Sequence, residues 1–369
     1  MFSIGPQFYF PIYYSLVALL SFLTFSRYET FSEERLYSEE RESNIGIVLF
    51  TLFIVLFIGL RPLSGKYFVD MANYNDVYNA IKGRTFILYT GWEGNLLFDN
   101  LFSYMATSGV HIKWFFLIVA TVYFIGISWA CSLLFPRDKF AAILVYLMAF
   151  STYAYATNGV KAGAAAALFL LAMAFYQKRQ WVGVVITLLL SFGMHHAMVM
   201  PIAAFLICHF VKNPRIFLVF WVVCFFLALF HVTFFQELFA SMINEHGAEY
   251  LLGKAGYVRT EIFGGFRIDF VLYSVVPIVV GLIAIEKKHI QSEKYEFILN
   301  LYTLTNAIWL LCMYSDYTNR IAYLSWFMYP IVLIYPFLNE EWEGPQYKYF
   351  QWVAYGHMAF NLFMAFIYW

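Results

Sequence analysis

The run KWFFLIVATVYFIGISWACSLLF, residues 113–135, is apolar apart from the lysine at its first position and the hydroxyl residues Thr121, Ser128 and Ser132. A helix that crosses the hydrocarbon core of a bilayer needs about 20 consecutive, mostly apolar residues, so this run predicts a membrane-spanning helix. Similar runs recur along the chain, near 8–26, 45–60, 140–157, 162–177, 216–235, 268–285, 295–314, 321–338 and 351–368. The chain is therefore expected to be an all-α, polytopic integral membrane protein.

The composition points to the same class of protein. Of the 369 residues, 62% are apolar and only 12% are charged, which is about half the charged share of typical soluble domains. This excludes a soluble enzyme, a disordered chain and a nucleic-acid binder that depends on bulk positive charge. No tandem repeat or low-complexity tract divides the sequence, so residues 1–369 are expected to form a single transmembrane domain.

The stretch 181–211 is too long for one crossing and short for two, and FGMHH at residues 192–196 interrupts it. Counting it as two helices that meet at the histidines gives about twelve spans, with both termini outside. One set of short loops then holds most of the short-loop lysines and arginines, whereas the short loops opposite hold only Lys161 and Arg320. Because short cytoplasmic loops are rich in Lys and Arg, the first set is expected to face the cytoplasm. These loops are 27–44, 136–139, 178–180, 211–215, 286–294 and 339–350.

Two long loops, 61–112 and 236–267, are expected on the outer side. In the first, Leu96, Leu97, Leu101 and Phe102 recur at helical spacing among polar residues. This periodicity predicts an amphipathic helix near residues 93–108.

Ionisable side chains at the outer ends of the predicted spans are the candidate site residues, because charges at membrane depth are costly and tend to mark functional sites. Arg61 ends a span, and Asp70 and Tyr74 follow it at a spacing that places both on one helix face. An arginine fork suits phosphate oxygens, and Asp70 can serve as a base or bind sugar hydroxyls. The alternative is an interfacial arginine followed by a solvated loop.

Three further places carry candidate residues on the outer side. Lys161 is the lone cation of its short loop and opens a span made of small residues. His195 and His196 lie at the break in 181–211, where an imidazole can accept a proton, although a hydrogen-bonded core histidine is the alternative. Asp316 and Arg320 form either an ordinary turn with an ion pair or a second anion-binding point. No Cys, Asp or Glu stands at ligand spacing beside the histidines, so no metal site is expected.

The order of these pieces resembles the EpsG/Wzy-like family of bacterial exopolysaccharide and O-antigen polymerases. That family has an arginine at the end of an early span, and an Asp and a Tyr in the loop that follows. An acidic residue then precedes an amphipathic helix, and a cation precedes a helix of small residues. Further along, a histidine closes a short helix and an arginine opens a late span. The matching residues are Arg61, Asp70, Tyr74, Glu93, Lys161, His195 or His196, and Arg320. The resemblance covers about residues 45–340.

The resemblance implies a GT-C-like fold and a glycosyltransferase acting at the periplasmic, outer face of the bacterial inner membrane. It implies an undecaprenyl-diphosphate-linked oligosaccharide as substrate, joined into O-antigen (part of lipopolysaccharide) or exopolysaccharide. Membrane lipid, a chain-length regulator and a flippase are the implied partners, nucleic acid is not, and no cofactor is needed because the donor is already activated.

The same resemblance suggests roles for individual residues. Substrate binding falls to Arg61, Tyr74, Glu93, Lys161, Asp316 and Arg320, of which the three cations would hold the diphosphate. The candidate catalytic residues are His195, Asp70 and His196.

Two other functions fit the same architecture. A flippase for the lipid-linked unit is compatible with twelve spans, but transporters carry polar groups near mid-membrane, and the predicted span centres here are nearly free of charge. Another outer-face transferase, such as an O-antigen ligase, differs only in its acceptor.

Overall fold

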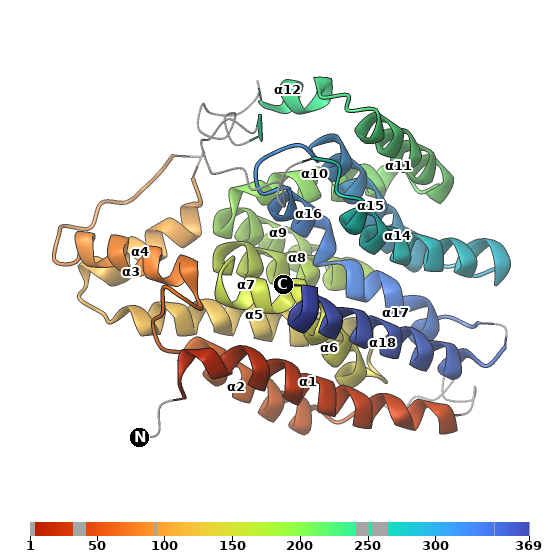
Figure 1. Cartoon of the computed structure of the whole chain (residues 1–369), viewed down its shortest axis with the longest axis horizontal. Helices are drawn as coiled ribbons and strands as arrows, with labels where there is room; N and C mark the ends of the chain where they lie inside the picture. Colours follow the sequence, from red (N-terminus) through yellow and green to blue (C-terminus); the bar gives the residue numbers. More distant parts are fainter. Residues whose placement is uncertain are drawn as a thin grey trace. The chain divides into compact units, whose positions relative to one another are not determined.

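The structure is a computed structural model that describes residues 4–31, 42–91, 94–240, 251–252, 265–342 and 344–368. Over these residues the chain is helical and forms no strand. The helices group into two compact units, Met1–Met198 together with Phe337–Trp369, and Val199–Pro336. Figure 1 shows the helices in their order along the chain.

The first unit is organised around α5. Along one side α5 packs against α2 and along another against α8, which in turn packs against α9. Small residues allow these close approaches, because a Cβ at Gly59 would lie 2.8 Å from Leu117 and one at Gly126 would lie 2.8 Å from Ala167. The helices are η1 (Pro6–Phe8), α1 (Tyr9–Phe25), η2 (Ser26–Thr30), α2 (Asn44–Gly59), α3 (Val69–Ile81), α4 (Leu96–Thr107), α5 (Ile112–Leu134), α6 (Lys139–Met148), α7 (Phe150–Thr157), α8 (Val160–Gln177), α9 (Trp181–Met194), η4 (His196–Met198), α18 (Gln346–Phe363) and η6 (Met364–Tyr368).

The second unit is built on α15. The helix α11 runs beside it in the same direction, because the Asn300 side chain donates to the Lys212 carbonyl near one end and the Tyr314 hydroxyl donates to the Ala228 carbonyl at the other. α11 therefore lies alongside α15 from Asn300 to the C-terminal end of that helix. The helices are α10 (Val199–Phe210), α11 (Pro214–Leu229), α12 (Phe234–Ala240), α14 (Ile268–Leu282), η5 (Ile283–Lys287), α15 (Glu293–Leu311), α16 (Thr318–Trp326) and α17 (Tyr329–Asn339), whose last turn belongs to the first unit.

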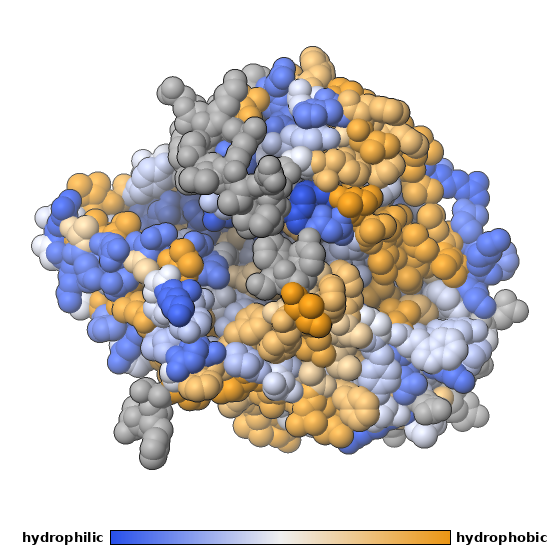
Figure 2. Space-filling model, viewed as in Figure 1, coloured by the Kyte–Doolittle hydropathy of each residue, from blue (hydrophilic) through white to orange (hydrophobic). Residues whose placement is uncertain are grey.

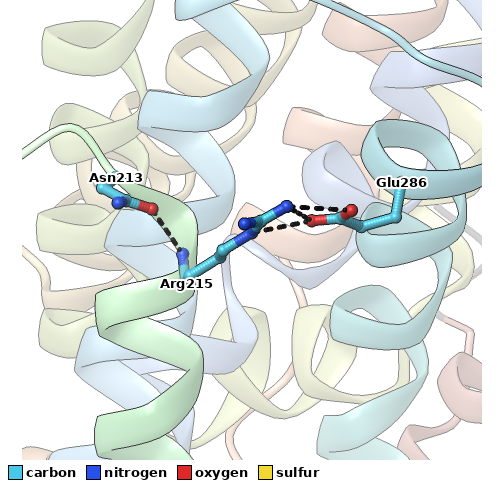
Figure 3. A network of polar contacts seen from close by, with 3 residues as sticks. All are labelled: Asn213, Arg215 and Glu286. Carbon is cyan, nitrogen blue, oxygen red and sulfur yellow. Dashed lines mark hydrogen bonds and ion pairs between the residues drawn. The ribbon is translucent and has the colours of Figure 1, made fainter.

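Two of the basic loops meet within the second unit. Arg215, whose N–H is capped by Asn213, donates through Nε and Nη2 to the two carboxylate oxygens of Glu286 at 3.1 and 3.2 Å (Figure 3). Lys212 and Glu293 make a second ion pair at 3.4 Å. Exposed pairs such as these contribute little to stability. They do place loops 211–215 and 286–294 at the same end of the unit, in agreement with the positive-inside assignment of both to one side.

Within the described residues, five helical stretches are long and apolar enough to cross a membrane, and six if the bent pair α6–α7 counts as one span. They are Pro6–Tyr28, Ile112–Leu134, Val160–Gln177, Ile268–Lys287 and Thr318–Asn339. Four shorter apolar helices are α2, α9, α11 and the stretch His196–Phe210. A 16-residue helix is about 24 Å long, shorter than the roughly 30 Å hydrocarbon core. The chain is thus a multi-pass helical membrane protein, and the twelve crossings stay a prediction.

The exposed surface of these helices is apolar. Val219 on α11 is 63% exposed and Leu272 on α14 is 60% exposed, and apolar side chains gather over both helices in Figure 2. Polar side chains are more frequent over α3 and α4. This distribution fits helices that face lipid and a polar region outside the hydrocarbon core.

The segment 140–157, predicted as one span, is two helices that meet at Ala149 with a bend of 74°. Neither proline nor glycine stands there. The bend instead persists because side chains of other helices satisfy the backbone groups that it frees. The hydrogen bonds run from the Phe150 N–H to Asn361 Oδ1 (2.8 Å), from His357 Nε2 to the Val145 carbonyl (3.1 Å) and from the Tyr13 hydroxyl to the Leu147 carbonyl (2.8 Å).

Replacing Asn361 by Leu tests this account of the bend. Asn361 is fully buried, and its loss leaves the Phe150 N–H without an acceptor, which costs about 1–3 kcal/mol. We expect the midpoint of thermal unfolding in detergent to fall by several degrees. Ala359→Leu, at an exposed position of the same helix, is the control and should leave the midpoint unchanged. Equal midpoints for both variants would contradict the role of Asn361.

Candidate functional site

Arg61 lies just after α2 and is 3% exposed. Its Nη1 donates to the Ile58 carbonyl at 2.8 Å and its Nη2 to the Thr157 carbonyl at 3.0 Å. The guanidinium carbon is 5.3 Å from the ring centre of Phe68 and 5.4 Å from that of Phe116. The Arg61 guanidinium is thus buried between two aromatic rings and is hydrogen-bonded to the end of α7, just before the turn that joins α7 to α8.

The charge of Arg61 has no carboxylate partner in the described part of the chain. Its Nε is buried and makes no hydrogen bond, and its two other bonds go to neutral carbonyls. Burial lowers the pKa of Arg61 to about 10, an effect that the Tyr153 and Tyr9 hydroxyls oppose, so the group is still positive at neutral pH. A buried charge without a counter-ion is costly. The site is therefore suited to an anion supplied by a ligand.

Asp70 and Tyr74 lie on α3, as the spacing of four predicts. The Tyr74 ring contacts Phe98 and Phe102 of α4 at 5.7 and 5.9 Å, and Phe116 of α5 at 6.4 Å. Tyr74 therefore shares Phe116 with Arg61 and packs α3 against both α4 and α5. Asp70 is in the first turn of α3 and is half-buried.

Lys161 is the second residue of α8, and the Gly159 N-cap contributes no side-chain cap to that helix. The N-terminus of a helix carries positive potential and backbone N–H groups that favour anions. The Thr157 carbonyl that binds Arg61 lies four residues earlier. The two predicted cations Arg61 and Lys161 thus come from adjoining segments of the first unit.

His195 and His196 lie where α9 ends and η4 begins. This agrees with the prediction of two helices that meet at the histidines. Asn95, the residue before α4, contacts both of them. Its Oδ1 accepts a hydrogen bond from the His196 backbone N–H at 3.0 Å and lies 3.1 Å from His195 Nδ1. A Cβ at Gly193 would lie 3.1 Å from the Leu97 Cβ, so the end of α9 and the start of α4 are in close contact.

These contacts define the state of the His195 ring. Because the Asn95 oxygen already accepts a backbone N–H, Nδ1 of His195 must be the donor in their contact. In the neutral ring the lone pair is then on Nε2, which can accept a proton. The His196 ring packs against Phe192, with centroids 5.3 Å apart and 56° between the ring planes. Asn95 thus contacts the ring of His195 and the backbone of His196.

Asp316 and Arg320 belong to the second unit. They make no ion pair with each other, and the Arg320 guanidinium carbon instead lies 4.7 Å from the ring centre of Tyr317. Tyr317 has a φ of +49°, a left-handed conformation that is uncommon for a non-glycine residue. Asp316 Oδ2 is buried without a hydrogen-bond partner. The predicted turn with an Asp316–Arg320 ion pair is therefore not what the structure shows.

Some predicted features lie outside the described residues. Glu93 is one of them, and so is most of the loop 236–267. In the loop 61–112, the predicted amphipathic helix near 93–108 is confirmed as α4. Among the described residues no group of three or more His, Cys, Asp or Glu could hold a metal ion.

The structure adds residues that the sequence did not single out. Asn95 contacts both histidines, Thr157 and Phe116 fix Arg61, and Arg267 is only 7% exposed and pairs with Asp269 at the start of α14. An Asn just before an amphipathic helix is an ordinary capping signal, so the link to the histidines could not be seen from it.

Comparison with known families places the chain. The sequence model of the EpsG family matches residues 44–366, which is most of the 369 residues. The chain belongs to the EpsG family. The family points to a glycosyltransferase-like polymerase and to a role in polysaccharide biosynthesis, in line with the resemblance seen in the sequence. No curated protein and no solved structure matched the chain.

Proposed function

We propose that this EpsG-family protein is a polymerase that joins lipid-diphosphate-linked oligosaccharide units at the outer face of the bacterial inner membrane, with undecaprenyl diphosphate as the lipid carrier. A twelve-span, GT-C-like arrangement with both termini outside is part of this proposal. The supporting observation is Arg61, a buried guanidinium with an unused Nε and no carboxylate partner among the described residues. A diphosphate that leaves during glycosyl transfer is the kind of anion such a group stabilises.

In the proposed reaction, a hydroxyl of the acceptor sugar attacks the anomeric carbon of the donor. The bond from that carbon to the diphosphate oxygen breaks, and the lipid diphosphate leaves with the electron pair. Arg61 and Lys161 stabilise the negative charge that grows on this leaving group, supported by the N-terminus of α8.

The proton of the attacking hydroxyl goes to Nε2 of His195. Asn95 holds the ring through Nδ1, which keeps Nε2 unprotonated before the reaction. Asp70 is the alternative base. Tyr74, Glu93, Asp316 and Arg320 are proposed to bind other parts of the two substrates.

Purified protein incubated with lipid-linked oligosaccharide is the direct test. We expect a ladder of products that grows by whole repeat units with time and without added nucleotide or metal. Boiled protein is the control. Movement of the lipid-linked unit across a liposome without any growth would instead indicate a flippase, and transfer only to a lipid A acceptor would indicate a ligase.

A further inference from the structure

A cavity of about 290 Å³ lies between α2 and α5 in the first unit. Its buried floor includes Thr51 and Ser128, whose hydroxyls bond to each other at 2.8 Å. Its rim is apolar and open: Val48, Leu52 and Trp129 are 52%, 46% and 50% exposed. No feature of the proposed chemistry uses this cavity.

The cavity follows from how α2 and α5 pack. At the Arg61 end of α2 the two helices touch, because Gly59 leaves no side chain between α2 and Leu117. The cavity is lined by residues toward the other ends, 44–52 of α2 and 125–132 of α5. The same pair of helices thus carries the anion site at one end and an apolar cavity further along.

We propose that this cavity binds part of the polyprenyl tail of the lipid carrier whose diphosphate is held at Arg61. The inference rests on the proposed function and places the tail in the cavity between α2 and α5. From Arg61 to Leu52 the distance along α2 is about 14 Å at 1.5 Å per residue. A long isoprenoid chain can cover that distance, whereas a chain of two isoprene units cannot fill the cavity from there.

The chemistry of the lining fits a hydrocarbon chain. The two hydroxyls on the floor satisfy each other, and Thr51 also donates to the Ile47 carbonyl. They therefore need no hydrogen bond from a ligand, and a hydrocarbon chain in the cavity gains van der Waals contacts with the apolar rim. The cavity opens on the lateral surface of α2 and α5, so a chain that enters it comes from the lipid phase.

The polar groups at the two ends favour the carrier lipid over an ordinary phospholipid. A phospholipid seated at the Asn44 end would place its headgroup near Lys139. That ammonium is 6% exposed and already donates to Asn44 Oδ1 at 2.6 Å and to the Glu42 carbonyl at 2.7 Å. Arg61, at the other end, keeps its Nε without a partner.

The variant Val48→Trp tests the proposal, because it covers the opening from an exposed position and should not disturb folding. Leu49→Trp is the matched control, since Leu49 is 63% exposed on the same helix but does not line the cavity. Each is assayed with two donors, one with the full undecaprenyl tail and one with two isoprene units. We expect Val48→Trp to raise KM for the long donor about tenfold with little change in kcat, and to leave the short donor unaffected.

A second variant, Ser128→Leu, fills the cavity from its floor and should have the same selectivity for tail length. Equal effects on both donors, or none on the long donor, would overturn the proposal while polymer formation by the unaltered protein still stands. Bound lipid is measured separately by mass spectrometry of the detergent-solubilised protein. If Val48→Trp displaces phosphatidylglycerol but not undecaprenyl phosphate, the cavity holds ordinary membrane lipid and the proposal fails. Absence of polymer from the unaltered protein with either donor would instead reject the proposed function.

Discussion

Replacing Arg61 by Ala is expected to lower the rate of polymer formation at least about 100-fold. Removing one preorganised group that stabilises a developing anion costs about 2.7–4 kcal/mol of transition-state energy, or a factor of 10²–10³. The burial of Arg61, with no carboxylate partner among the described residues, places it in this class. Product ladders from purified protein with the lipid-linked donor measure the effect.

Arg61 also holds the Thr157 carbonyl, so the Ala variant can lose activity through altered structure. Arg61→Lys separates the two effects, because it keeps the charge but loses the planar fork. We expect it to unfold at a temperature close to that of the unaltered protein and to retain intermediate activity. Binding of polyprenyl diphosphate should weaken in both variants.

An exposed arginine of the loop 61–112 provides the control. Arg84→Met removes a guanidinium that is in open solvent and should leave the rate within about twofold. If both Arg61 variants react at the wild-type rate, Arg61 takes no part in the reaction. A loss that tracks the unfolding temperature alone would make its role structural.

The fold was predictable from sequence wherever the signal is local. The amphipathic periodicity around Leu97 gives α4 to within a few residues, and the break at FGMHH gives the meeting of α9 with η4. The bend at Ala149 was not predictable, because the groups that satisfy it come from Tyr13, His357 and Asn361. Hydrogen bonds between positions more than 100 residues apart cannot be detected in a short window of the sequence.

The candidate site divides in the same way. Scarcity of charge was enough to select Arg61 and Lys161, since a cation at a span end is conspicuous in a chain with only 12% charged residues. The partners and the orientation of each side chain could not be predicted from the sequence. Among the described residues Arg61 has no carboxylate partner, which depends on the segments that pack around it. The orientation of His195 depends on Asn95, which lies 100 positions earlier.

Asn95→Ala is expected to lower kcat about tenfold to 100-fold while KM for the donor changes little. Without the Asn95 oxygen, the His195 ring loses the bond that orients it and that keeps the proton on Nδ1. General base catalysis typically contributes 10²–10⁴-fold, so His195→Ala should lose more than Asn95→Ala. Single-turnover rates with saturating lipid-linked donor measure both.

A positioning role and a merely structural role of Asn95 predict different outcomes for Asn95→Asp. A carboxylate oxygen can still accept from the His196 N–H and from His195 Nδ1, so Asn95→Asp should recover most of the activity, whereas Asn95→Leu should not. Added imidazole should partly restore His195→Ala but not Asn95→Ala. His196→Ala keeps its backbone N–H and the bond to Asn95, so its loss should stay below about tenfold. If His196→Ala is instead the inactive variant and His195→Ala the mild one, the base is His196 and the role of Asn95 lies in the backbone bond.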